Sequence, residues 1–266
     1  MRPHRNLRPR RWLEPLRGNI KFHRATGVAL LLSLLHGATM AGVLLGGTRV
    51  VFGEKDREGH ISMKNTGVSP YIIQAWSDAG EGQNKTPFVV TPPLSRLDPG
   101  KENILRIVRG PASALPADRE SVFWLNVKEI PEKSSDEDVL QVAVRSRIKL
   151  FYRPSGLPGK AAEAKDRLQW AVASNDKGEA VLKVANPTPY YITLTTLDIN
   201  GGQQVIDADM AAPFGEQVYP LAAVKSPQEI QVTFSTINDY GGVTDKEKVR
   251  VPVGDKPVAL KAEPAE

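Results

Sequence analysis

Residues 138–153 read Asp138-Val-Leu-Gln-Val-Ala-Val-Arg-Ser-Arg-Ile-Lys-Leu-Phe-Tyr-Arg153. Apolar residues alternate at Leu140, Val142 and Val144 and again at Ile148 and Leu150, and the residues between them include Gln141, Arg145, Arg147 and Lys149. A period of two predicts a β-strand with two different faces. At about 3.3 Å per residue, a strand from Leu140 to Tyr152 would span roughly 40 Å, against about 5–6 residues for an ordinary strand. We therefore expect it to extend past its own sheet and expose an apolar row, although a long core strand or two strands joined by a bulge would give the same pattern.

Short strand patterns with turn signals between them fill the rest of the chain after residue 42. In the first half they are Val43–Phe52, His60–Asn65, Tyr71–Ser77, Phe88–Thr91, Asn103–Val108, Val122–Glu129 and Leu140–Tyr152. Seven strands at this spacing predict an immunoglobulin-like sandwich. In the second half they are Leu168–Ala173, Ala180–Ala185, Tyr190–Ile199, Gln217–Tyr219, Glu229–Ser235 and Lys248–Val253, which predict a second, smaller β-domain. Ala161–Leu168 is the only candidate helix.

The leader has the features of a secretory signal peptide. Residues 1–27 are basic, residues 28–35 are a short apolar run, and small residues follow as far as Ala41. Such a run is too short to span a bilayer, so we expect cleavage after Ala41. The chain then divides into a signal peptide (1–41), a first domain (42–153), a Pro/Gly-rich linker (154–160), a second domain (161–254) and a flexible tail (255–266).

Composition excludes several classes of protein. The net charge of +5 is misleading, because eight basic residues and one acidic residue lie in 1–41, which leaves a net charge of −2 for the remainder. A nucleic-acid partner is therefore not expected. The chain has no cysteine, and only His60 remains after the leader, so no His/Cys metal cluster is expected. No Gly-rich phosphate loop with the required spacing occurs either, and no cofactor is expected.

Five motifs occur in a characteristic order, and one of them overlaps the end of residues 138–153. They are residues 91–97 (TPPLSRL), 119–131 (RESVFWLNVKEIP), 148–154 (IKLFYRP), 186–191 (NPTPYY) and 237–242 (INDYGG). Together they closely resemble the periplasmic pilus-assembly chaperones, the PapD-like family, from about Gly42 to about Val253. The resemblance implies an all-β fold of two immunoglobulin-like sandwiches in a boomerang arrangement, a periplasmic location and no enzymatic activity.

The resemblance also implies a mechanism and its residues. The chaperone lends an edge strand to a pilus subunit that lacks one, and an outer-membrane usher then receives the subunit. Leu140, Val142 and Val144 match the family's donated residues. Arg49 and Lys149 match its anchor for the subunit's C-terminal carboxylate. A third set, Glu120, Arg153 and Asp239, matches its interdomain ion network.

Some alternatives stay open at this point. Val144 and Lys149 are an odd number of residues apart, so either strand twist or a bulge must bring both to one subunit. An unoccupied donor strand could pair with a second copy of the chain and form a self-capping homodimer. The main rival function is an exported two-domain adhesion or structural protein. A hydrolase on a β scaffold is a weaker rival, because the chain after the leader has only one histidine.

Overall fold

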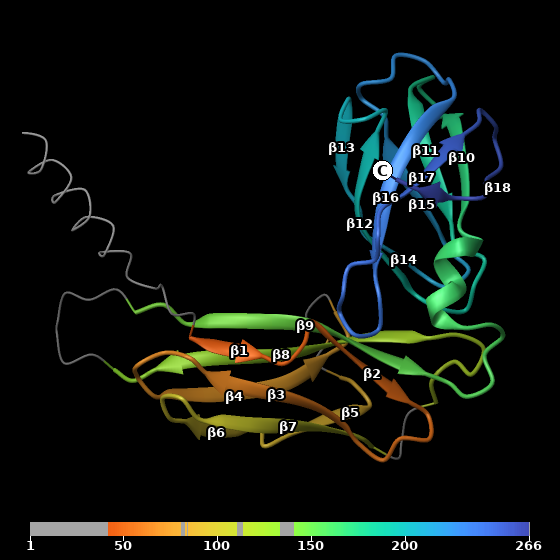
Figure 1. Cartoon of the computed structure of the whole chain (residues 1–266). Helices are drawn as coiled ribbons and strands as arrows, with labels where there is room; N and C mark the ends of the chain where they lie inside the picture. The colour runs from red at the N-terminus through yellow and green to blue at the C-terminus, as the bar shows by residue number, and fades with distance from the viewer. Residues whose placement is uncertain (1–41, 81–82, 84, 111–113, 134–140, 266) are drawn as a thin grey trace, which may run out of the picture. The chain divides into compact units, whose positions relative to one another are not determined.

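The computed structural model describes residues 42–80, 83, 85–110, 114–133 and 141–265. These residues form two sandwiches of β-strands, as predicted, with one short 3₁₀ helix between them. Strands β1–β9 belong to the first sandwich and β10–β19 to the second (Figure 1). The predicted signal peptide and Leu140 lie outside the described residues. Within the described residues, no helix is long and apolar enough to cross a membrane.

The first sandwich consists of two sheets. One has the strand order β1-β3-β7-β5, and the other has the order β2-β9-β8-β4-β6. Alternate residues of both sheets face inward and form one core that includes Phe52, Leu105, Leu125 and Leu150. The bounds are β1 (Val43–Leu45), β2 (Arg49–Gly53), β3 (Gly59–Asn65), β4 (Tyr71–Asp78), β5 (Phe88–Thr91), β6 (Leu94–Leu97), β7 (Glu102–Arg109), β8 (Ser121–Pro131) and β9 (Val144–Arg153).

The first strand differs from its prediction. Val43–Phe52 was expected to be one strand, but it is divided into β1, which pairs with β3, and β2, which pairs with β9 in the opposite sheet. Gly46 and Gly47 lie at the division. The chain therefore passes from one sheet to the other at this point, so the beginning of the domain contacts both layers of the sandwich.

The second sandwich has the sheet orders β15-β11-β10-β18 and β13-β12-β16-β17-β19, with β14 paired to β12. Its core includes Trp170 and Phe234, whose ring centroids are 5.1 Å apart. The 3₁₀ helix η1 covers Ala161–Arg167, where the only candidate helix was expected. The strands are β10 (Gln169–Ser174), β11 (Ala180–Ala185), β12 (Ile192–Ile199), β13 (Gln204–Asp207), β14 (Met210–Ala211), β15 (Glu216–Pro220), β16 (Ile230–Ile237), β17 (Glu247–Val251), β18 (Val258–Ala259) and β19 (Glu263–Pro264).

The last segment of the chain was expected to be flexible. Within it, β18 pairs with β10 and β19 pairs with β17. Both pairings involve only two residues on each strand, so the segment lies against the second sandwich through few backbone hydrogen bonds.

Candidate functional site

Strand β9 has a partner on both sides for only part of its length. On one side it pairs antiparallel with β8 from Val144 to Tyr152. On the other side it pairs parallel with β2, and only from Lys149 to Arg153. Residues 144–148 therefore have no strand partner on the β2 side within the described part of the chain. An open edge of this kind can accept another strand.

The apolar row of β9 continues beyond the core. Even-numbered residues of the strand share one face. Leu150 and Tyr152 on this face are buried, with 0% and 2% of their surface exposed. Val144 is 50% exposed and Val142, which precedes the strand, is 62% exposed. Apolar side chains that the chain's own core does not cover therefore lie beside the open edge.

The structure also shows where the strand begins and how regular it is. Among the described residues, β9 starts at Val144, so it is shorter than the predicted strand from Leu140 to Tyr152. Its register with β8 is continuous from Val144 to Tyr152. A bulge is therefore absent from this part of the strand, and Val144 and Lys149 lie on opposite faces of it.

Two cations lie where the open edge ends. Arg49 is the first residue of β2, and it pairs directly with Lys149 in the parallel register. Arg49 Nη1 donates to the carbonyl oxygen of Ile237 at 3.0 Å and to Thr193 Oγ1 at 3.5 Å. Its guanidinium lies 5.7 Å from the centre of the Phe151 ring.

Neither cation forms a salt bridge with a carboxylate of the described residues, and Lys149 makes no hydrogen bond with them; more distant carboxylates, Asp239 and Glu120 for Arg49 and Asp209 for Lys149, only partly offset the effect of burial. Arg49 Nε is buried without a hydrogen-bond partner. Burial lowers the pKa of Lys149, and the neighbouring charge of Arg49 lowers it further. Burial likewise lowers the pKa of Arg49. Two adjacent, partly desolvated cations would be stabilised by an anion, and a carboxylate suits them, because Arg can bind it with two hydrogen bonds.

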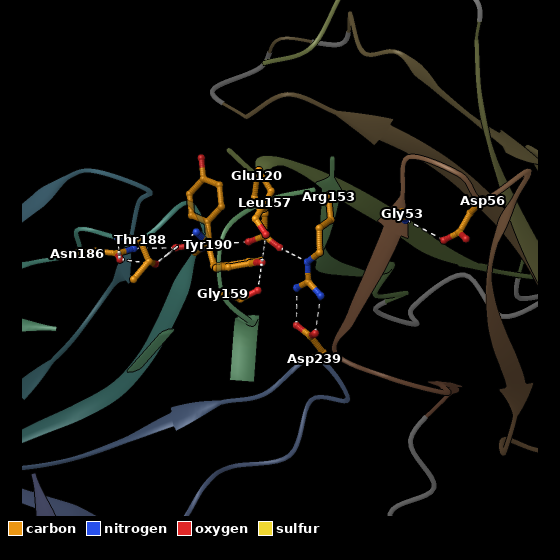
Figure 2. Close-up of polar contacts among 11 residues, drawn as sticks. Gly53, Asp56, Glu120, Arg153, Leu157, Gly159, Asn186, Thr188, Tyr190 and Asp239 are labelled. Carbon is orange, nitrogen blue, oxygen red and sulfur yellow. Dashed lines mark hydrogen bonds and ion pairs between the residues drawn. The ribbon is translucent and has the colours of Figure 1, made fainter. Parts of the chain in front are cut away.

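Glu120, Arg153 and Asp239 are in direct contact, as Figure 2 shows. Arg153 donates through Nε to Glu120, and through Nη1 and Nη2 to both oxygens of Asp239 at 2.7 and 2.8 Å. Glu120 also accepts the backbone N–H of Tyr191 at 2.7 Å. Glu120 immediately precedes β8, Arg153 ends β9 and Asp239 lies in the turn after β16, so the contacts join the first sandwich to the second.

The charges in this network have opposing influences. Burial raises the pKa of Glu120, whose side chain is only 1% exposed, and Arg153 counteracts that rise. Burial opposes protonation of Arg153, but its hydrogen bonds with Asp239 and Glu120 outweigh it and raise the pKa of the guanidinium. Arg153 therefore stays charged and holds both carboxylates.

A cavity of about 370 Å³ lies between Arg49 and the ion network. Arg49 and Phe151 line it, as do Glu120, Arg153 and Asp239. One space thus borders both the cation at the end of the open edge and the ion network.

The two family models of pilus chaperones match nearly all of the described chain. The model of the pili and flagellar-assembly chaperone PapD N-terminal domain matches residues 42–158. The model of the pili assembly chaperone PapD C-terminal domain matches residues 163–248. The chain belongs to this chaperone family.

Individual relatives agree with the family models. YadV, a probable fimbrial chaperone of Escherichia coli K12, is 37% identical over 221 residues, which cover 78% of this chain and 89% of the relative. The crystal structure of YadV has a TM-score of 0.68 at 36% identity, covering 79% of this chain and all of that one. The SafB chaperone of Salmonella enterica, in complex with the SafA pilin, has a TM-score of 0.69 at 26% identity, covering 81% of this chain and 99% of SafB.

These findings confirm the resemblance, the fold and the function as a pilus-assembly chaperone. They do not favour the exported adhesion or structural protein that was the main alternative. The family is one of chaperones and not of a known enzyme class.

Sequence reasoning missed a polar cluster on the outer face of the same sheet. Asp78, at the end of β4, is only 4% exposed. It accepts hydrogen bonds from Arg147 at 2.9 Å, from Asn126 at 2.7 Å, from Arg145 at 3.3 Å and from the backbone N–H of Gly80 at 2.9 Å. Burial alone would raise the pKa of Asp78, but these hydrogen bonds outweigh it and lower the pKa below its usual range.

No local pattern in the sequence predicts this cluster. Asp78 and Arg147 are 69 positions apart and meet only because β4, β8 and β9 are adjacent in one sheet. Arg147 also stacks on Trp124, with its guanidinium 4.0 Å from the centre of the aromatic ring. The alternation of residues 144–149 predicted that these arginines share a face, but it could not predict the carboxylate that they bind.

Proposed function

We propose that this chaperone captures a pilus subunit along the open edge of β9, by donating Leu140, Val142 and Val144 to it. One observation carries the proposal: the edge is open at residues 144–148, exposed apolar side chains accompany it, and it ends at the cation pair of Arg49 and Lys149. Strand addition of this kind derives affinity from backbone hydrogen bonds and specificity from alternate side chains.

The position of β2 determines how the added strand would run. Strand β2 begins at Arg49 and is parallel to β9, so a subunit strand on the same edge would end where β2 begins. Its C-terminal carboxylate would then lie at Arg49 and Lys149, which requires it to run parallel to β9. The open edge of five residues spans roughly 16 Å.

The contributions of the donated apolar residues and of the cation pair to the free energy of binding can be compared. Each fully buried Val or Leu contributes about 1.5–3 kcal/mol, so three donated residues contribute roughly 5–9 kcal/mol before ordering costs. Charge-assisted hydrogen bonds to the carboxylate contribute about 1.5–3 kcal/mol each. Two or three such hydrogen bonds would contribute roughly 3–9 kcal/mol, so the apolar row and the cation pair would contribute similar amounts, and the cation pair would also set the register.

The ion network of Glu120, Arg153 and Asp239 would hold the two sandwiches at a fixed angle, which keeps Arg49 beside Ile237 and Thr193. The chaperone would act in the periplasm after removal of residues 1–41, and would deliver its subunit to an outer-membrane usher. Without a subunit, a second copy of the chain could cover the open edge.

Copurification tests this function directly. The chain is produced in the periplasm together with the pilus subunits of its own organism, and complexes are isolated through a tag on the chaperone. We expect a one-to-one complex with a small β-rich subunit, and we expect the subunit to aggregate when the chaperone is omitted. Recovery of the chain alone or with itself, while the subunits remain soluble without it, would refute the proposal.

A further inference from the structure

Glu129 is a buried carboxylate that the strand-donation mechanism does not use. It lies near the end of β8 and is only 5% exposed. One of its oxygens, Oε2, accepts the backbone N–H of Val43 at 3.0 Å. No positively charged side chain of the described residues pairs with it. Burying a carboxylate with so little compensation is costly, and burial accordingly raises the pKa of Glu129.

The α-carbon of Gly42 packs against this same oxygen. A Cβ atom placed on Gly42 would lie 2.3 Å from Glu129 Oε2 and 3.2 Å from the hydroxyl oxygen of Tyr71. The backbone nitrogen of Gly42 is bonded directly to that α-carbon. The carbonyl oxygen of Gly42 accepts the backbone N–H of Thr66 at 2.9 Å. Gly42 is thus held in place beside a carboxylate that lacks a cation.

Removal of the leader would change the charge at this position. Hydrolysis of the Ala41–Gly42 amide adds one water, which leaves a carboxylate on Ala41 and an amine on Gly42. An α-amino group has an ordinary pKa of about 7.7–8.0, so this amine takes up a proton at neutral pH. We propose that Glu129 is the binding site for the α-ammonium group that signal-peptide cleavage creates at Gly42. The inference rests on the predicted cleavage after Ala41, and so on the export that the proposed function requires.

The pair would complete the first sandwich. Gly42 leads into β1 of one sheet, whereas Glu129 belongs to β8 of the other, so the pair would tie the two sheets together. Glu129 also lies directly opposite Val144, the first residue of β9. Before cleavage, the nitrogen of Gly42 is part of a neutral amide, so it cannot form an ion pair with Glu129. The domain that carries the open edge would therefore reach its full stability only after the leader is removed.

A cycle of four proteins tests the pairing. The chain beginning at Gly42 is prepared with a free amine and with an Nα-acetyl group, each with Glu129 and with Glu129→Gln. We expect acetylation to lower the Tm by about 3 °C or more when Glu129 is present, and to leave it unchanged in Glu129→Gln. A chain that begins at Ala41 serves as the matched control, since it keeps the positive charge but moves it by about 3.8 Å. It should melt like the acetylated chain.

Several results would overturn the inference. They are equal effects of acetylation in the unmodified chain and in the Glu129→Gln variant, no effect of acetylation at all, or a periplasmic chain whose N-terminus, measured by mass spectrometry, is not Gly42. If Glu129→Gln does not fold, Glu129→Asp replaces it and should show a smaller effect of acetylation. Subunit capture is measured on the same proteins. Capture without thermal coupling refutes this inference alone, whereas coupling without capture refutes the proposed function alone.

Discussion

Replacing Val142 by aspartate separates donation to a subunit from burial in the chain's own core. Val142 is 62% exposed and precedes β9, so the new carboxylate would face water in the free chaperone. Exposed substitutions usually change stability by at most about 0.5 kcal/mol, which corresponds to a Tm shift of at most about 2 °C. Val144 is less suitable for this test, because it pairs with the buried Glu129 and an aspartate there would face a second carboxylate.

In a subunit complex the same carboxylate would be buried without a partner. The lost valine contributes about 1.5 kcal/mol, and an unpaired buried charge costs several kcal/mol more. A total loss of about 4 kcal/mol weakens binding roughly 1,000-fold. Such a change converts a stable complex into one that does not survive isolation.

The assay combines thermal melting of the free chaperone with recovery of the subunit in a pull-down. Val89→Asp provides the matched control, because Val89 is also 62% exposed in the first sandwich but belongs to β5 in the other sheet. We expect Val142→Asp to melt normally and recover no subunit, and Val89→Asp to behave like the unmodified chain. A large fall in the Tm of Val142→Asp, or undiminished recovery of the subunit, would refute the reasoning.

Four further predictions follow from the charged groups and the leader. Lys149→Ala should fold normally, since Lys149 has no hydrogen bond or ion pair among the described residues, but should recover little subunit in the same pull-down. Arg153→Ala should lower the Tm by roughly 10 °C, because it leaves Glu120 buried without its cation; an unchanged melt would argue against the network. Asp78→Asn should destabilise the chain at pH 7 in urea unfolding. The pKa of Asp78 is lowered, so its stabilisation is present above the ordinary value of about 3.9 and is lost as the pH falls through the lower, folded-state pKa; the difference between the two chains should therefore shrink towards pH 2 and not grow. Mass spectrometry of the periplasmic fraction should find an N-terminus at Gly42, whereas intact protein in the inner membrane would contradict cleavage.

The alternation of residues 138–153 predicted the faces of β9 well, for a physical reason. Successive side chains of a strand point to opposite faces, so the sequence alone determines that Leu150 and Val144 share one face. It does not determine where the core ends along that face. The start of β2 at Arg49 determines where the edge becomes open, and this start depends on the change of sheet at Gly46 and Gly47.

The motifs identified Arg49, Lys149, Glu120, Arg153 and Asp239 without showing how they are connected. The structure brings the last three into contact and places the first two side by side.

The partners of Asp78 and Glu129 could not be predicted, because each depends on which strands are adjacent and in what register. Glu129 is one of many acidic residues in the sequence, and only its burial beside Gly42 distinguishes it.

The charges on β9 affect which kind of strand would pair with its open edge. Exposed edge strands tend to pair with one another, and charged side chains along them are a common protection. Arg145, Arg147 and Lys149 share the outer face of β9, and of these three cations the two arginines donate hydrogen bonds to Asp78, whereas Lys149 does not. A second copy of β9 would bring the same three cations to the edge, and like charges across a strand pair are destabilising. A subunit strand that ends in a carboxylate would instead bring an opposite charge to Lys149 and Arg49. The basic residues would thus favour a subunit over a second chaperone, although the backbone edge offers the same hydrogen bonds to both.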